Sequence, residues 1–174
     1  MVETKVTYLG VQITHGSRRL CSDRVQGILQ SPSPMTWKQL QAFLGLTGYC
    51  RIWIPNFGQI AQPLDESLKG RDDSIPLMWG TPQKKAEATL KQALTQAPAL
   101  RLPDPEKAFQ LCVHEREGIA LGVLTQRLGS EPQPVAYLSK KLNPTTRGWP
   151  PCLWNLKAIA IMIEDALKLS FGAN

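Results

Sequence analysis

The chain has 174 residues, of which 43% are hydrophobic and 20% charged, and this length allows one domain or two small ones. The composition is typical of a globular protein and excludes disorder along the whole chain. Twenty Lys and Arg against 14 Asp and Glu leave a formal net charge of +6, which favours a polyanionic partner. Fourteen Pro and 13 Gly must separate many short elements, which argues against a coiled coil or a simple bundle of long helices.

Cysteine usage and the ends of the chain indicate a compartment. Cys21, Cys50, Cys112 and Cys152 form no Cys-x-x-Cys pair and no Cys/His cluster with metal-ligand spacing. We therefore expect reduced, mostly buried thiols in an intracellular protein, either cytoplasmic or nuclear. The N-terminus lacks an apolar signal core, and the longest apolar stretch, near residues 158–163, is too short to span a bilayer. We expect no association with membranes.

The first 34 residues predict a small hairpin followed by a helix. Residues 6–13 (VTYLGVQI) indicate one extended segment, and a turn at residues 15–17 returns the chain as a second strand at 18–20. A helix is expected around residues 22–29. The SPSP motif at 31–34 then interrupts the chain, because each Pro restricts the residue before it to extended conformations.

Three helices are expected next. Thr36 and Gln39 fit a capping box, with Leu40 and Phe43 following at helical spacing. A shorter amphipathic stretch covers residues 56–69. A third helix is predicted to begin with Thr81 as its N-cap and Pro82 at its first position, and to stop at Pro98.

The predicted secondary structure changes from helices to strands after Pro98. A proline-punctuated linker leads into three plausible strands at residues 109–113, 119–126 and 134–139, which suggest an antiparallel meander. A helix from about residue 153 to 169 follows, with an apolar stripe made of Leu156, Ile159, Ala160 and Ile163.

Basic residues concentrate in two zones, and such zones suit sequence-independent contacts with phosphates. Scattered solubilising charge is the alternative. The first zone, residues 15–51, contains a single acid, Asp23, and the second zone, residues 125–157, contains a single acid, Glu131. The basic residues are Arg18, Arg19, Arg24, Lys38 and Arg51 in the first zone, and Arg127, Lys140, Lys141, Arg147 and Lys157 in the second.

The helix that begins after Thr36 carries a second stripe beside its apolar face, made of Gln41, Gly45 and Tyr49. Glycine within a helix costs about 1 kcal/mol relative to alanine. Gly45 is therefore better explained if another backbone or a ligand approaches it closely. A tightly packed second helix and a bound ligand both satisfy this condition.

No residue set in the sequence assembles a catalytic or metal centre. Asp72 and Asp73 are adjacent carboxylates, but they lie in a Gly/Arg/Ser/Pro loop that favours a solvated turn over a cation site. His15 and His114 are isolated, and there is no Ser/His/Asp set, phosphate-binding loop or dinucleotide fingerprint. We predict no catalytic residue and no metal ligand in this chain.

The order of several segments resembles the Pol polyprotein of gammaretroviruses and their endogenous relatives, known as class I endogenous retroviruses. The similarity covers nearly the whole chain. It is carried by YLG at 8–10, QLQAFLGLTGYCRIWIPNF at 39–57, APALRLPDP at 97–105, GVLTQRLG at 122–129 and PVAYLSKKLNPTTRGWPPCL at 134–153.

This resemblance implies an α+β fold taken from the middle of a reverse transcriptase, an RNA-directed DNA polymerase. Residues 1–30 would be the end of the palm with a primer-grip-like hairpin, and residues 31–97 a helical thumb. Residues 98–174 would be a partial connection domain, an inactive ribonuclease H-like β-β-β-α unit whose sheet is cut short and has an unpaired edge.

The resemblance also implies residue roles. Tyr8, Leu9 and Gly10 fall on the hairpin that holds the primer 3′ end, and Gln41, Gly45 and Tyr49 on the thumb helix that follows the minor groove. The nucleic-acid-binding set expected from the resemblance and the basic zones together is Tyr8, Leu9, Gly10, Lys38, Gln41, Gly45, Tyr49, Arg51, Lys140 and Lys141.

Departures from the active enzymes imply that this fragment is not catalytic alone. The Tyr-x-Asp-Asp motif of the palm does not occur, and His114 stands where active ribonucleases H carry Asp. The full enzyme would use Mg²⁺ or Mn²⁺, but we expect no cofactor here and no nucleotide incorporation. The expected partners are a template–primer duplex and the remaining polymerase and ribonuclease H domains. The alternative is a domesticated or vestigial product that acts as a protein-interaction module or has no function.

Overall fold

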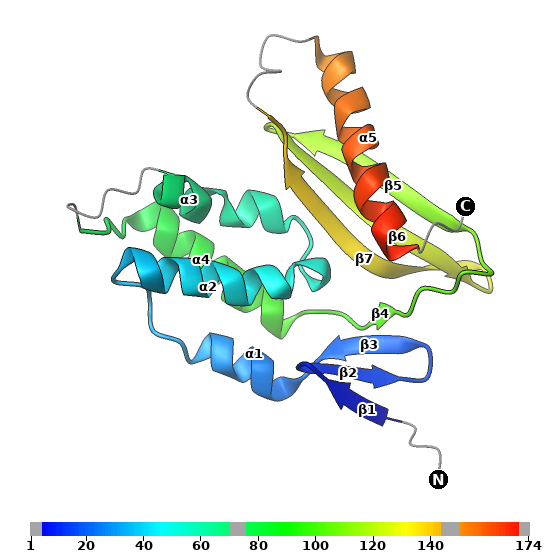
Figure 1. Cartoon of the computed structure of the whole chain (residues 1–174), viewed down its shortest axis with the longest axis horizontal. Helices are drawn as coiled ribbons and strands as arrows, with labels where there is room; N and C mark the ends of the chain where they lie inside the picture. Colours follow the sequence, from blue (N-terminus) through cyan, green and yellow to red (C-terminus); the bar gives the residue numbers. More distant parts are fainter. Residues whose placement is uncertain (1–4, 70–75, 144–149, 171–174) are drawn as a thin grey trace.

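A computed structural model describes residues 5–69, 76–143 and 150–170 (Figure 1). Three units follow one another: a small N-terminal sheet, a helical unit, and a second sheet covered by a helix. The elements are β1 (Lys5–Tyr8), β2 (Val11–Thr14), β3 (Ser17–Leu20), α1 (Ser22–Leu29), α2 (Trp37–Tyr49), the 3-10 turn η1 (Arg51–Trp53), α3 (Phe57–Lys69), α4 (Thr81–Thr95), β4 (Leu100–Arg101), β5 (Phe109–Arg116), β6 (Ile119–Leu128), β7 (Glu131–Lys141) and α5 (Pro151–Leu169).

The N-terminal sheet has the antiparallel order β1-β2-β3-β4. The prediction of one extended segment over residues 6–13 was wrong, because Leu9 and Gly10 adopt φ angles of 49° and 76° and reverse the chain between β1 and β2. Left-handed angles at two consecutive residues are typical of a two-residue hairpin turn. The segment after Pro98, which the sequence predicted to be a linker, supplies the fourth strand of this sheet, since Ser17 of β3 pairs with Arg101 of β4.

The helical unit consists of α2, α3 and α4. The capping box predicted at α2 is confirmed: the Thr36 hydroxyl accepts from the Gln39 amide, and the Gln39 side chain accepts from the Thr36 amide. Helix α4 begins one residue earlier than predicted, because Gly80 is its N-cap and Thr81 is already helical. The shared core includes Leu40, Phe43, Leu64, Leu90 and Leu94.

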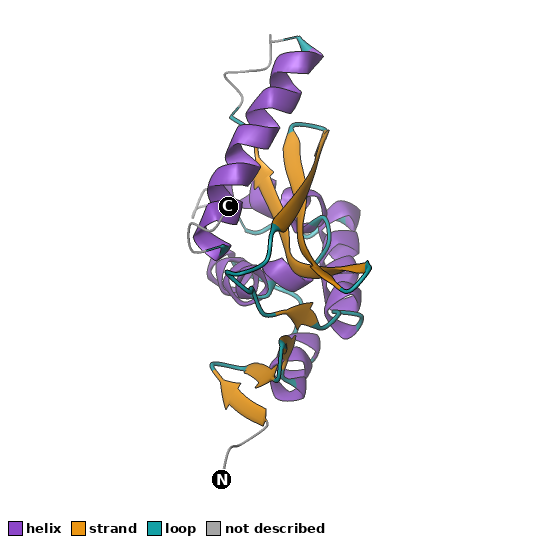
Figure 2. Cartoon of the chain, turned by 90° about the vertical axis from the view of Figure 1, so that its right-hand side faces the viewer, coloured by secondary structure: helices purple, strands orange, loops and turns teal. Residues whose placement is uncertain are grey.

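The second sheet is a meander of β5, β6 and β7, as predicted, with longer strands than the sequence indicated. Glu117 and Gly118, with φ angles of 55° and 76°, form the turn between β5 and β6. Helix α5 packs across one face of this sheet (Figure 2). The fit is close at Gly122, where an added Cβ would lie 3.1 Å from the Met162 sulfur. The described architecture confirms the predicted α+β class.

The apolar stripe predicted on α5 faces away from the sheet. Leu156, Ile159 and Ile163 are 60%, 41% and 46% exposed, whereas Ala158 and Met162 are fully buried against the sheet. Helix α5 is therefore apolar on two opposite sides. Among the described helices, none is long and apolar enough to cross a membrane.

The helical unit and the second sheet meet at Ser139 of β7. The Ser139 hydroxyl accepts a hydrogen bond of 2.9 Å from the Gly58 amide of α3, and its carbonyl accepts from the Arg51 guanidinium. Ser139 is only 4% exposed. An ion pair of 3.1 Å between Lys141 and Glu66 lies at the edge of the same contact. These bonds fix the orientation of one unit relative to the other.

All four cysteines are free thiols. The expectation that they are mostly buried was wrong: Cys50 is buried and Cys21 is half-buried, but Cys112 and Cys152 are exposed. Cys112 lies on β5, whose side chains alternate between the face covered by α5 and the opposite, exposed face. The position of Cys112 in this alternation, and not its apolar character, determines that its side chain is exposed. Burial raises the pKa of the Cys50 thiol to about 11.

Candidate nucleic-acid interface

Helix α2 presents an exposed polar stripe opposite its buried face. Lys38, Gln41, Gly45 and Tyr49 follow one another at intervals of three or four residues, and all four are exposed. On the other side, Leu40, Phe43 and Thr47 are buried. We call the four exposed residues the α2 stripe. It carries a cation, an amide, a bare stretch of backbone and an aromatic ring along one line.

Gly45 leaves the middle of the α2 stripe open. A Cβ added at this position would meet no atom within 4 Å. The described residues therefore place no second helix against Gly45, and close helix packing does not explain the glycine. Since glycine weakens a helix by about 1 kcal/mol, a bare backbone at this point is consistent with close approach by a molecule from outside.

The turn between β1 and β2 is tied to the C-terminal end of the α2 stripe. The Leu9 carbonyl accepts two hydrogen bonds, one of 3.0 Å from the Tyr49 hydroxyl and one of 2.9 Å from the Arg24 guanidinium. Arg24 also stacks on the Tyr49 ring, with 4.3 Å between the guanidinium carbon and the ring centroid. Tyr8 and Leu9 themselves are 65% and 63% exposed. Two exposed side chains at the tip are thus held next to the stripe.

Gly10 is required for this arrangement. Its φ angle is 76°, and an added Cβ would lie 2.1 Å from Nε of Arg24. The sequence identified Arg24 only as one charge of a basic zone, although it positions the tip. A pattern of charges along the chain carries no information about which arginine reaches a carbonyl 15 residues away.

Arg51, Lys140 and Lys141 lie elsewhere and have protein partners. Arg51 donates to the Ser139 carbonyl, Lys141 pairs with Glu66, and Lys140 lies 3.5 Å from Asp165. Their role in binding nucleic acid stays a prediction, because the structure does not bring them to the α2 stripe. From the same basic zones, Arg18 donates to the Val135 carbonyl, and Arg147 lies outside the described residues.

Two acids next to these lysines have a lowered pKa. For Asp165, burial alone would raise the pKa, but the hydrogen bond from Lys168 and the charges of Lys140 and Lys168 outweigh it. For Glu66, the hydrogen bonds from Gln62 and Lys141 lower the pKa. Both acids are therefore charged at neutral pH and neutralise basic charge away from the α2 stripe.

The described residues do not fit a divalent metal centre. No group of three or more His, Cys, Asp and Glu side chains within residues 5–69, 76–143 and 150–170 could hold an ion. His114 is exposed on β5, and the adjacent Glu115 carboxylate accepts from the Gly118 amide of its own turn. Asp72 and Asp73 lie outside the described residues. The absence of a cofactor stays a prediction.

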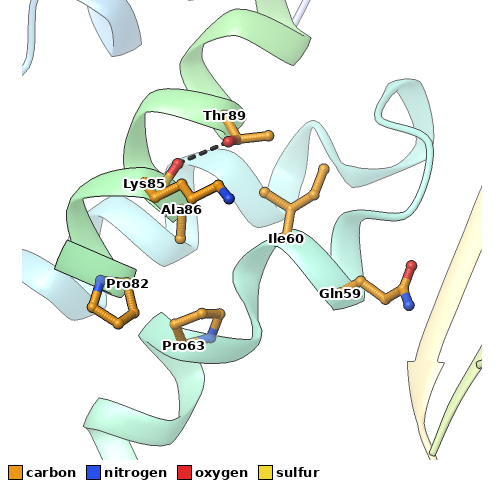
Figure 3. A pocket seen from close by; sticks show the side chains of 7 residues that line it. All are labelled: Gln59, Ile60, Pro63, Pro82, Lys85, Ala86 and Thr89. Atoms are coloured by element: carbon orange, nitrogen blue, oxygen red, sulfur yellow. Dashed lines mark hydrogen bonds between the residues drawn. The ribbon is translucent and has the colours of Figure 1, made fainter. Parts of the chain in front are cut away.

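A shallow pocket of about 340 Å³ lies between α3 and α4 (Figure 3). Ile60, Pro63, Pro82 and Ala86 make most of its wall. Lys85 is the cation among the lining residues, and the Thr89 hydroxyl donates a hydrogen bond to the Lys85 carbonyl. The lining residues offer no paired acid, base or nucleophile, so this pocket adds no candidate chemistry.

Comparisons with curated proteins find retroviral polyproteins. The chain is 51% identical over 172 residues to the Gag-Pol polyprotein of avian reticuloendotheliosis virus and 47% identical over 170 residues to that of baboon endogenous virus (strain M7). These alignments cover 99% and 98% of this chain but 15% and 10% of the relatives. The predicted resemblance to gammaretroviral Pol is confirmed.

Solved structures of similar fold come from foamy virus. A protease-reverse transcriptase in complex with double-stranded DNA matches 99% of this chain and 30% of its own, with a TM-score of 0.87 and 26% identity. The same kind of protein in complex with an RNA/DNA hybrid matches 98% of this chain and 23% of its own, with a TM-score of 0.84 and 25% identity.

A family match completes the assignment. Residues 79–172, more than half of the chain, match the family described as the RNase H-like domain found in reverse transcriptase. This match covers β5, β6, β7 and α5, the part in which the sequence predicted a ribonuclease H-like order of strands and helix. The chain belongs to this family and corresponds to part of the reverse transcriptase and ribonuclease H region of a retroviral Pol polyprotein.

Proposed function

We propose that this chain is the thumb and connection region of a retroviral-type reverse transcriptase and that it contacts a template–primer duplex without being catalytic alone. In this proposal residues 1–30 are the end of the palm, residues 31–97 the thumb and residues 98–174 the connection. Its partners are an RNA–DNA or DNA duplex and the remaining polymerase and ribonuclease H domains.

The observation that carries this proposal is the α2 stripe with its open glycine. Gly45 offers bare backbone with free space around it, which suits the close approach of sugars in a shallow minor groove. Lys38, about two turns towards the N-terminus, is placed to meet a phosphate. These groups bind by shape and charge rather than by base identity, as a protein that copies any sequence requires.

The tip of the β1–β2 hairpin extends the same surface. Tyr8 and Leu9 are exposed beside the α2 stripe, and the bonds from Tyr49 and Arg24 to the Leu9 carbonyl hold the tip in place. A duplex that follows α2 therefore meets the tip at the end of the helix. This is the geometry expected if the tip holds one strand end while α2 holds the groove.

Foamy virus relatives of known structure support the choice of ligand. Their structures contain double-stranded DNA or an RNA/DNA hybrid, and they share the fold over nearly all of this chain. The proposal carries this duplex partner over to the α2 stripe of this chain.

A salt titration of binding to an RNA–DNA hybrid tests the proposal. Binding should weaken linearly in a double logarithmic plot as salt rises, because phosphate contacts release counterions. Lys38→Gln should reduce the slope by about 1. Lys84→Gln, an exposed change on α4 away from the stripe, is the matched control and should leave the slope unchanged. Binding that does not depend on salt would contradict the proposal.

A further inference from the structure

The pocket between α3 and α4 offers no catalytic group, but its wall is suited to binding a small molecule. We call it the α3–α4 pocket. Its volume of about 340 Å³ is at the lower end of the range for small-molecule sites, about 300–1,000 Å³. The residues that line it all belong to α3 and α4. A ligand at this position is therefore separate from the duplex contacts proposed for α2.

Much of the wall of the α3–α4 pocket is apolar, and two proline rings form part of it. Pro63 of α3 and Pro82 of α4 lie at the same end of the pocket in Figure 3, and Ile60 and Ala86 extend the apolar surface. Proline rings pack well on flat aromatic rings, as they do when Pro-rich segments dock in aromatic-lined grooves. This part of the wall therefore favours an aromatic ring.

Pro63 also leaves a hydrogen-bond acceptor at the wall of the pocket. It lies within α3, and proline has no N–H with which to bond the carbonyl four residues earlier in a helix. That carbonyl belongs to Gln59, which is another lining residue. A ligand with an N–H group can supply the donor that the helix lacks at this position.

Lys85 gives the α3–α4 pocket a positive charge. The Lys85 side chain is exposed, and its ammonium group points across the pocket towards Ile60 (Figure 3). None of the described acids forms an ion pair with it. The Thr89 hydroxyl already donates to the Lys85 carbonyl. The ammonium group is therefore available to an anion from outside, and it is a compact charge with three donors.

We propose that the α3–α4 pocket binds a small aromatic carboxylate that carries an N–H group. The ring packs on Pro63 and Pro82, the carboxylate pairs with Lys85, and the N–H group donates to the Gln59 carbonyl. Indole-3-carboxylate combines these three features in one flat molecule and serves as the probe.

A titration of the whole chain with indole-3-carboxylate, followed by amide NMR shifts, tests the site. The shifts should saturate with a dissociation constant of about 1 mM, the value expected for a ligand of this size. Lys85→Gln should raise this constant about fivefold, because it removes a partly exposed ion pair. Lys84→Gln, at an equally exposed neighbour outside the lining, is the matched control and should bind like the wild type. No saturation by about 10 mM, or equal losses in the two variants, would overturn the proposal.

Two further changes test the contact with the Gln59 carbonyl. The compound 1-methylindole-3-carboxylate lacks the N–H group, so the wild-type chain should bind it about fivefold more weakly than the parent compound. Pro63→Ala supplies an N–H group for the Gln59 carbonyl, so the chain should unfold at a higher temperature and bind the two compounds with equal affinity. Equal binding of both compounds by the wild type, or a Pro63→Ala chain that still prefers the parent compound, would exclude this contact.

Discussion

At the residue scale, Gly10 controls the tip of the β1–β2 hairpin. Alanine at this position must keep a φ angle near 76° and would place Cβ 2.1 Å from Nε of Arg24. The guanidinium must then leave the Leu9 carbonyl and the Tyr49 ring. Arg24, one of the two residues that hold the tip, can therefore reach it only past a glycine.

Gly10→Ala should therefore lower the free energy of unfolding by more than Gly16→Ala. Gly16 has a similar φ angle of 81° but meets nothing within 4 Å, so it reports the backbone cost alone, about 1–2 kcal/mol. The excess for Gly10→Ala should be about 1 kcal/mol and should vanish in an Arg24→Ala background. Denaturant unfolding of Gly10→Ala, Gly16→Ala, Arg24→Ala and the Gly10→Ala/Arg24→Ala double variant measures this excess. Equal losses at Gly10 and Gly16 would mean that Arg24 does not hold the tip.

At the element scale, β7 joins the second sheet to the helical unit through Ser139. Ser139→Ala leaves the half-buried Gly58 amide without its acceptor, and such a loss costs about 1–3 kcal/mol. The free energy of unfolding measured in urea should fall by that amount. Ser130→Ala, in the exposed turn before β7, is the control and should have little effect. A neutral Ser139→Ala would show that the two units do not depend on this bond.

The last turns of α5 are linked to β7 by charge, and this linkage predicts a pH dependence. The pKa of Asp165 is lowered in the folded chain, so its contribution to stability is fully present above the pKa of the unfolded chain, about 3.9. It is lost as pH falls through the lower folded pKa. The stability difference between wild type and Asp165→Asn should thus be constant at neutral pH and shrink below about pH 4. Thermal unfolding from neutral to acidic pH measures it; a constant difference would contradict the linkage.

Element order and type could be predicted from the sequence because the signals were local. The Thr36/Gln39 capping box and the prolines marked helices α2 to α4, and three plausible strand segments in a row marked β5 to β7. The Leu9–Gly10 turn was missed because apolar residues on both sides made residues 6–13 look like one strand. The residues of the α2 stripe could be named, but the bonds to Leu9 from Tyr49 and Arg24 span 40 and 15 residues and have no local signature.

At the scale of the whole molecule, the α2 stripe belongs to the helical unit, and the second sheet is joined to this unit. Ser139 and the Lys141–Glu66 pair hold the helical unit and the second sheet in one orientation. In the proposed function, a duplex that follows α2 therefore meets one fixed arrangement of thumb and connection.

The central claim, that α2 meets a duplex at Gly45, is tested most directly by Gly45→Leu. Because an added Cβ meets nothing within 4 Å and Gly45 is exposed, the helix should gain about 1 kcal/mol of stability, while affinity for an RNA–DNA hybrid should fall at least roughly tenfold. Gly27→Leu, at an equally open and exposed glycine on α1, should stabilise without affecting binding. The account predicts opposite changes in stability and affinity for Gly45→Leu; unchanged affinity in a folded Gly45→Leu chain would contradict it.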